Sequence, residues 1–205
     1  MKRTSLPVPQ LLLALFLLLT LAGCSAAPSD TSDPPLQEPA ASSQPSSGSA
    51  TSLGSLQSFS AGTLDGELFT QEQLQDKDVT VLNVWALTCP PCIAELPDLA
   101  AFANALPDNI QLITLCLDGA GNEETLQTLL AEAGFQGATL ISADGDLLDL
   151  CNSLLYTPTT LLADAGGNLV GDVIIGRQEN LPEVYLDAVN RALADAGKAE
   201  VSLET

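Results

Sequence analysis

Two cysteines separated by two prolines, Cys89-Pro90-Pro91-Cys92, are the residues of this 205-residue chain best suited to chemistry. Two thiols at this spacing can cycle between a dithiol and a disulfide, which is the basis of thiol-disulfide exchange. A zinc site is the alternative interpretation of such a pair. Zinc needs two more ligands, however, and the sequence has no histidine and no second Cys-x-x-Cys pair. We therefore interpret Cys89 and Cys92 as a redox pair.

The flanking segments predict a buried strand before the pair and a helix after it. Residues 79–85 (VTVLNVW) are β-branched and aromatic, which is typical of a strand inside a parallel sheet. Pro90 and Pro91 fit the first turn of a helix, where the amide hydrogens have no intrahelical partner. Cys89 is then at the helix N-terminus, which favours a thiolate, and is the expected nucleophile. Cys92, one turn further on, is the expected resolving thiol.

Residues 53–205 predict a single α/β domain, since about 150 residues can bury one sizeable core. Alternating apolar positions predict an N-terminal β-hairpin, after which strands alternate with helices until a closing hairpin and a last helix. This order predicts a mixed central sheet with helices on both faces. The expected strands after the redox pair are residues 110–117, 139–141, 159–163 and 169–175, and the expected helices begin near Asn122, Asp144 and Asn180.

The first 52 residues do not have the pattern of a folded domain. Residues 1–23 combine a basic start, a leucine-rich stretch and small residues, as in a secretory signal peptide. The end of this segment, with Cys24, resembles a bacterial lipobox. Cys24 would then be the lipidated first residue of the mature protein. An uncleaved membrane helix is the alternative, but the apolar run of about eleven residues is shorter than the roughly twenty that a span needs. Residues 24–52, rich in Ser, Pro and Ala, predict a disordered tether.

The charge of the chain limits its partners. Six basic residues oppose 26 acidic ones, which gives a formal net charge of −20. Cleavage before Cys24 removes Lys2 and Arg3, so that 4 minus 26 leaves −22. This charge disfavours nucleic acid and anionic lipid surfaces as partners. We interpret it as a determinant of solubility, with recognition of a basic substrate patch as the alternative.

The region from about Phe59 to Ala194 resembles the thioredoxin-like, membrane-tethered reductases typified by TlpA and ResA. The matching motifs are VLNVWA at 81–86, CPPC at 89–92, AELP at 94–97 and YTPTTLL at 156–162. The resemblance implies a thioredoxin-like fold with an N-terminal β-hairpin extension and a strand and helix inserted before a cis-proline. It also implies an extracytoplasmic thiol-disulfide oxidoreductase with no metal and no cofactor beyond its redox-active disulfide.

The resemblance assigns Pro158 as the cis-proline that faces the two cysteines. Such a bond would leave the backbone of Thr157 free to pair with an extended substrate segment. An ordinary proline at the start of a strand is the alternative. The residues expected to contact substrate are Trp85, Thr88, Pro90, Pro91, Thr157 and Pro158.

Glu95 follows Cys92 by three residues and therefore lies on the same side of the predicted helix. By the family match it would be a proton shuttle for the dithiol, because a carboxyl in an apolar site can have a raised pKa. A solvated surface carboxylate is the alternative. Asn83 stands where cytosolic thioredoxins have a buried aspartate, and a neutral asparagine cannot take up the proton.

The sequence departs from the family on each side of the redox pair. Thr88 precedes Cys89 where an aromatic residue is usual, and Ile93 follows Cys92 where a basic residue is usual. Loss of that cation removes one group that would stabilise the Cys89 thiolate. These departures leave the redox potential and the direction of electron transfer open.

The resemblance favours reduction, with Cys89 attacking a substrate disulfide and Cys92 resolving the mixed disulfide. It implies a protein anchored by lipid to the bacterial cell membrane, recharged by a membrane thiol-electron carrier, and acting on apocytochrome c or other oxidised exported proteins. We expect a monomer. One alternative is an oxidant that forms disulfides, and another is a lipoprotein without enzymatic activity that binds metal or substrate through its thiolates.

Cys116 and Cys151 are the cysteines that neither the redox motif nor lipidation uses. Both occupy apolar positions of a predicted strand and a predicted helix, so one interpretation is two inert core thiols. The second is a structural disulfide between them, because disulfides persist outside the cell membrane.

Overall fold

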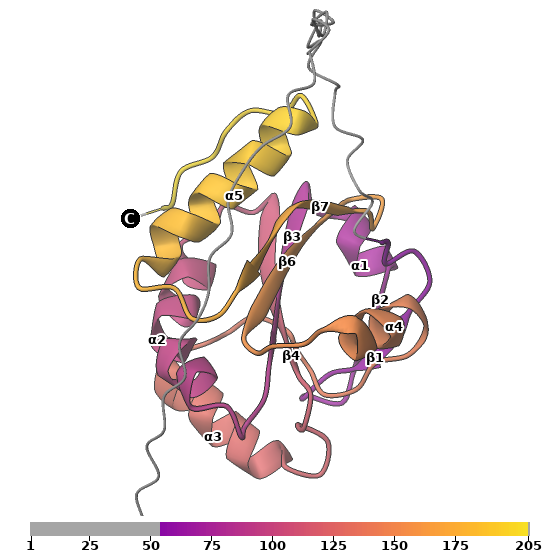
Figure 1. Cartoon of the computed structure of the whole chain (residues 1–205), viewed down its shortest axis with the longest axis vertical. Helices are drawn as coiled ribbons and strands as arrows, with labels where there is room; N and C mark the ends of the chain where they lie inside the picture. Colours follow the sequence, from indigo (N-terminus) through magenta and orange to yellow (C-terminus); the bar gives the residue numbers. More distant parts are fainter. Residues whose placement is uncertain (1–53, 205) are drawn as a thin grey trace, which may run out of the picture. The chain divides into compact units, whose positions relative to one another are not determined.

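The computed structural model describes residues 54–204 (Figure 1). The predicted signal peptide (1–23), the predicted lipidation site Cys24 and the predicted tether (24–52) lie outside the described residues. Among the residues that are described, no helix is both long enough and apolar enough to cross a membrane.

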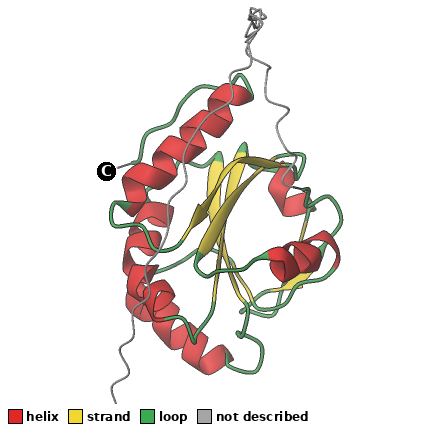
Figure 2. Ribbon diagram, in the orientation of Figure 1, coloured by secondary structure: helices red, strands yellow, loops and turns green. Residues whose placement is uncertain are grey.

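A five-stranded mixed sheet forms the centre of the domain (Figure 2). Its strands, in spatial order, are β5 (Thr139–Leu140), β4 (Ile110–Cys116), β3 (Val79–Trp85), β6 (Thr159–Asp164) and β7 (Leu169–Ile175). The first three are parallel to one another, β6 is antiparallel to β3, and β7 is antiparallel to β6. All residues of the central strand β3 are buried, which explains its continuous run of apolar and β-branched residues.

Helices cover both faces of the sheet, as the sequence predicts. One face carries α2 (Pro90–Asn104), α3 (Glu123–Ala133) and α5 (Leu181–Asp195), and the other carries α1 (Glu72–Gln75), α4 (Gly145–Ser153) and the hairpin of β1 (Ser60–Gly62) and β2 (Leu68–Thr70) (Figure 1). Each face has its own apolar cluster. The hairpin confirms the predicted N-terminal extension, and β5 with α4 confirms the predicted insertion.

The expected helix starts are correct to within a residue, but only one of the three expected caps makes a side-chain bond. Asp144 accepts a hydrogen bond from the amide of Gly145 at 2.8 Å. Asn122 and Asn180 precede α3 and α5 without a side-chain cap bond.

Strand pairing brings two distant segments to one end of the sheet. Trp85 ends β3, and the chain then turns into α2. Val84 of β3 pairs with Thr159 of β6, so the segment that precedes β6 lies beside the turn that precedes α2. Antiparallel pairing of β3 with β6 therefore places Pro158 at the end of the sheet that carries the cysteines.

Candidate active site

The redox pair forms a disulfide at the N-terminus of α2. The Sγ atoms of Cys89 and Cys92 are 2.02 Å apart, and their Cα atoms are 5.3 Å apart. Cys89 is the N-cap residue, and the backbone N–H of Cys92 donates a hydrogen bond to its Sγ at 3.3 Å. Because Pro90 and Pro91 have no N–H, the Cys92 amide is the first in the helix that can make this bond. The same amide can stabilise a thiolate on Cys89 after reduction.

The two sulfur-bearing residues differ in access. Cys89 is 9% exposed and Cys92 is 0% exposed. Pro90 and Pro91 are exposed beside them. An incoming disulfide therefore meets Cys89 first, which supports the predicted division into nucleophile and resolving thiol.

The loop before β6 faces the nucleophile. The Thr157–Pro158 peptide bond is cis, and the carbonyl oxygen of Thr157 lies 3.5 Å from Sγ of Cys89. Pro158 is buried and its carbonyl accepts a 2.8 Å hydrogen bond from the amide of Gly176. This arrangement holds the Thr157 backbone next to the sulfur that a substrate must reach.

Glu95, on the helix that begins with the redox pair, is buried in a chain of polar groups. It is 1% exposed, so the interpretation as a surface carboxylate is wrong. Nδ2 of Asn83 donates to Oε1 of Glu95 at 3.2 Å and to Oγ1 of Thr160 at 3.0 Å. The Thr160 hydroxyl is in turn 2.6 Å from the hydroxyl of Tyr185 on α5. The other oxygen of Glu95, Oε2, has no hydrogen-bond partner among the residues described.

The environment of Glu95 suits proton transfer near neutral pH. Burial raises the pKa of its carboxyl to about 7 from an ordinary 4.5, while the Asn83 hydrogen bond and the charge of Arg177 oppose the rise in pKa. A carboxyl with this pKa can both release and take up a proton near neutral pH. Glu95 also lies one turn after Cys92 on the same helix, as the proton-shuttle prediction requires.

Asp118 is a site residue that the sequence interpretation missed. Its Oδ1 accepts a 2.7 Å hydrogen bond from the amide of Leu87, and its Oδ2 lies 3.3 Å from both the amide and the hydroxyl of Thr88. The Cys116 thiol also donates to Oδ1 at 3.3 Å. Partial burial acts to raise the pKa of Asp118. The hydrogen bonds from Leu87, Cys116 and Thr88 outweigh this effect and hold the pKa below its usual value. An ionised carboxylate thus organises the turn that leads into Cys89.

Trp85 is not a substrate contact, contrary to the prediction. It is 0% exposed and packs in the same apolar cluster as both cysteines. Thr88, in contrast, is exposed in the turn before Cys89, where a substrate can reach it.

Cys116 and Cys151 are free thiols, which agrees with the interpretation as two core thiols and not with the alternative of a structural disulfide between them. Cys116 belongs to the apolar cluster under α2, α3 and α5, whereas Cys151 packs against the cluster on the opposite face of the sheet. Burial raises the pKa of Cys116 to about 12 and that of Cys151 to about 11. Both thiols are therefore protonated near neutral pH.

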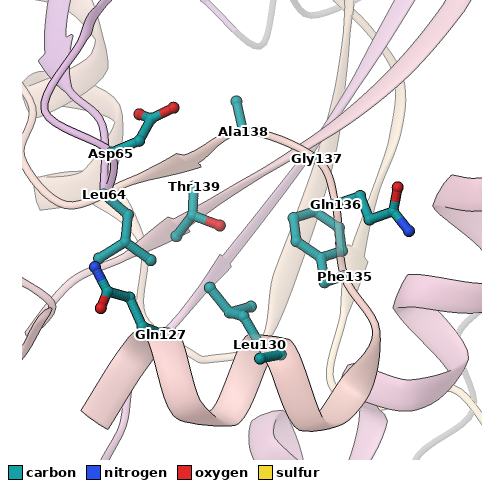
Figure 3. A pocket seen from close by; sticks show the side chains of 10 residues that line it. Leu64, Asp65, Gln127, Leu130, Phe135, Gln136, Gly137, Ala138 and Thr139 are labelled. Carbon is teal, nitrogen blue, oxygen red and sulfur yellow. The ribbon is translucent and has the colours of Figure 1, made fainter. Parts of the chain in front are cut away.

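A separate cavity lies away from the dithiol, between α3 and β5 (Figure 3). Its volume is about 280 Å³, and the side chains of Leu130 and Phe135 form part of its apolar wall. Neither α2 nor the Thr157–Pro158 loop contributes to it. Across the described part of the chain, no cluster of three or more His, Cys, Asp or Glu side chains is arranged to hold a metal ion.

Comparison with known proteins agrees with this geometry. Residues 55–186 match the AhpC/TSA family. The chain is 26% identical over 113 residues, 54% of its length, to sporulation thiol-disulfide oxidoreductase A of Bacillus subtilis, of which 67% is covered. It is 24% identical over 127 residues, 62% of its length, to the thiol:disulfide interchange protein HelX of Rhodobacter capsulatus, of which 69% is covered.

The fold is also that of solved oxidoreductases. The structure of DsbF from Mycobacterium tuberculosis, in mixed oxidised and reduced forms, superposes with a TM-score of 0.51 at 28% identity. The match covers 68% of this chain and 95% of the DsbF chain. The architecture is therefore a thioredoxin-like fold, with the redox pair at the start of α2.

Proposed function

Since this chain belongs to the AhpC/TSA family and is a thioredoxin-like thiol-disulfide oxidoreductase, we propose that it is a lipid-anchored reductase of disulfides in exported proteins. The observation that carries this proposal is the asymmetry of the redox pair. Cys89 is reachable and lies beside the Thr157 backbone, while Cys92 is enclosed and lies one turn from a buried carboxyl.

The reaction begins with the reduced protein. The Cys89 thiolate attacks one sulfur of a substrate disulfide, the substrate S–S bond breaks, and the leaving thiolate takes up a proton. Cys92 then gives its proton to Glu95 and attacks Sγ of Cys89. This step forms the Cys89–Cys92 disulfide, breaks the mixed disulfide and releases the second substrate sulfur as a thiolate, which takes up a proton from water. The substrate gains two electrons and the protein loses two, so a thiol-electron carrier in the membrane must reduce the protein again.

The surroundings of Cys89 favour reduction over oxidation of substrates. Strong oxidants of this kind have a highly stabilised thiolate, which makes their disulfide easy to reduce. Here two prolines remove amide donors from the first turn, and Ile93 supplies no cation. A less stabilised thiolate makes the dithiol the better electron donor. We therefore expect a reduction potential nearer about −270 mV than about −120 mV.

Substrate trapping tests the proposed function directly. In Cys92→Ala the resolving thiol is absent, so mixed disulfides on Cys89 should accumulate and be recovered from whole cells by non-reducing electrophoresis. Cys89→Ala is the matched control and should trap nothing. Trapping of equal amounts by both variants would contradict the assigned roles, and a measured potential near about −120 mV would favour the disulfide-forming alternative.

The proposal that the protein lies outside the cell membrane is based on its N-terminal sequence. The signal-like residues 1–23 end directly before Cys24, and residues 24–52 are long enough to hold the domain away from the bilayer. Apocytochrome c and other oxidised exported proteins are the candidate substrates in that compartment.

A further inference from the structure

A carboxylate lies beside the turn that leads from the central strand into Cys89. The amide of Leu117 donates to the carbonyl of Trp85 at 2.9 Å, which continues the parallel pairing of β3 with β4 past the ends of both strands. The next residue, Asp118, is therefore brought against Thr88, whose amide and hydroxyl both lie 3.3 Å from Oδ2. Because Thr88 directly precedes Cys89, the sheet itself holds this carboxylate next to the nucleophile.

Donors from the turn and from β4 keep Asp118 ionised. Besides the amide and hydroxyl of Thr88, the amide of Leu87 donates to Oδ1 at 2.7 Å, and the Cys116 thiol donates to the same oxygen at 3.3 Å. Burial acts to raise the pKa of Asp118, but these hydrogen bonds hold it below its usual value. Burial also raises the pKa of Cys116 to about 12, so this thiol keeps its proton and remains a donor. Asp118 thus carries a negative charge near neutral pH.

The other groups around Sγ of Cys89 give a thiolate little support. Among the described residues, the amide of Cys92, at 3.3 Å, is the one hydrogen-bond donor to this sulfur. The loop before β6 contributes the carbonyl oxygen of Thr157, 3.5 Å from Sγ, and α2 contributes the buried carboxyl of Glu95 one turn after Cys92. A carbonyl oxygen and an ionised carboxylate both disfavour an anion on Sγ. The charge of Asp118 acts in the same sense.

The cations of the described residues do not offset this charge. There are four of them: Lys77, Arg177, Arg191 and Lys198. Arg177 follows β7, which runs parallel to β3, and so lies at the end of the sheet that carries the redox pair. It is already 3.9 Å from the carboxylate of Asp98 on α2, and both side chains are about half exposed. Lys198 instead binds Asp78, directly before the opposite end of β3.

We propose that Asp118 sets the reduction potential of the redox pair by placing a negative charge beside the Cys89 thiolate. A thiolate close to a like charge is less stable, and a dithiol with a less stable thiolate gives up its electrons more readily. Asp118 therefore makes the protein a stronger reductant of substrate disulfides. This inference rests on the proposed function and names a residue that directs the dithiol toward reduction.

Replacement of Asp118 by asparagine isolates the charge, because the asparagine carbonyl can still accept the hydrogen bond from the Leu87 amide. The reduced full-length protein is alkylated with iodoacetamide between about pH 5 and about pH 10, and mass spectrometry locates the reaction at Cys89. In Asp118→Asn the pH midpoint of this reaction should fall by about one unit. Glu95 and Cys92 titrate in both proteins, so the difference between the two profiles reports Asp118.

Equilibration with glutathione measures the effect on the potential. In this exchange the reduced protein and one glutathione disulfide give the Cys89–Cys92 disulfide and two molecules of glutathione. At about pH 8 the equilibrium constant should be about fivefold lower in Asp118→Asn than in the wild type, which corresponds to a potential about 20 mV less negative.

Two control variants separate the charge of Asp118 from other effects. Asp118→Glu keeps the charge and should retain the wild-type midpoint and equilibrium constant. Asp149→Asn removes an exposed acid from α4, which lowers the net charge equally, and should also leave both quantities unchanged. Circular dichroism of each variant checks that it is folded.

Each contrary outcome has a distinct meaning. If the midpoint and the equilibrium constant of Asp118→Asn matched those of the wild type, the inference would be overturned and the proposed function would stand. Equal shifts in Asp118→Asn and Asp118→Glu would overturn it as well, because they would assign the effect to the geometry of the turn. An equal shift in Asp149→Asn would assign the effect to net charge and not to Asp118. A wild-type protein that reduces no disulfide would contradict the proposed function itself.

Discussion

Nδ2 of Asn83 donates a 3.2 Å hydrogen bond to Oε1 of Glu95 inside the core, and this bond joins the central strand to the helix that carries the redox pair. It occupies one carboxyl oxygen and leaves Oε2 without a partner among the described residues. Oε2 is therefore the atom on which a proton can be held and exchanged. A neutral asparagine on β3 thus positions an acid on α2.

Replacement of Glu95 by glutamine should remove a pH-dependent step from the reaction. In the wild type, the resolution of a mixed disulfide on Cys89 should accelerate as pH rises through about 7, because ionised Glu95 accepts the Cys92 proton. Glu95→Gln should slow resolution about a hundredfold at pH 8 and abolish the rise of its rate with pH near 7. Glutamine can still accept the hydrogen bond from Asn83. Fluorescence of Trp85, the only tryptophan in the chain, provides a stopped-flow signal beside the dithiol.

The exposed Glu132 on α3 provides the matched control. Glu132→Gln makes the same chemical change on the surface and should leave the pH profile unaltered. If Glu95→Gln retained the wild-type profile, Glu95 would have no part in proton transfer.

Burial of Glu95 should also make stability depend on pH. The folded-state pKa of about 7 lies above the ordinary value of 4.5, so the unfolded chain loses this proton first as pH rises. The free energy of unfolding should then fall by about 3 kcal/mol between about pH 4.5 and about pH 7 and level off above that. Urea unfolding of the oxidised protein measures this fall. An equal fall in Glu95→Gln would trace it to other groups.

Asp118→Ala should loosen the turn before Cys89. The change leaves the Leu87 and Thr88 amides without their acceptor, which should cost about 1 to 2 kcal/mol in the free energy of unfolding. Because Cys89 follows this turn directly, its alkylation rate in the reduced protein should change as well. Asp149→Ala, which removes an exposed acid from α4, is the control and should change neither quantity. Identical behaviour of the two variants would show that Asp118 does not position the turn before Cys89.

Thiol counting should find both Cys116 and Cys151 free. In Cys24→Ser with the redox pair oxidised, both thiols should react slowly with iodoacetamide at neutral pH, because the raised pKa of each keeps it protonated. Both should react rapidly once the protein is unfolded without reductant. Unfolded protein with no reactive thiol would instead demonstrate a disulfide between them.

Cys24→Ala should release the protein from the membrane. Lipidation requires the cysteine thiol, so the variant should move from the membrane fraction to the soluble fraction while its domain keeps full exchange activity. Immunoblotting of the two fractions, with Cys116→Ala as a cysteine control, checks this. Continued tight membrane association of Cys24→Ala would support an uncleaved membrane helix instead.

Local features of the sequence were sufficient to predict the chemistry of this protein. The spacing of Cys89 and Cys92, the two prolines between them and the apolar strand before them act within one strand and one turn of helix. Such short-range patterns determine local structure through backbone sterics and hydrogen bonding, and these effects depend only on residues close together in the sequence. The resemblance to TlpA and ResA added Thr157 and Pro158, which no local pattern would have connected to the cysteines. It also gave a role in proton transfer to Glu95, which helical spacing had already placed on the side of Cys92.

Tertiary structure alone decided which side chains surround the redox pair. Asp118 follows β4 in a loop without periodicity, and only the parallel pairing of β3 with β4 brings its carboxylate to Leu87. Apolar periodicity marks Cys116 and Cys151 as buried but does not say on which face of the sheet each lies, and the fold places them on opposite faces. Burial of Trp85 and of Glu95 likewise depends on packing between elements far apart in sequence, because burial is a property of the assembled layers rather than of any one segment.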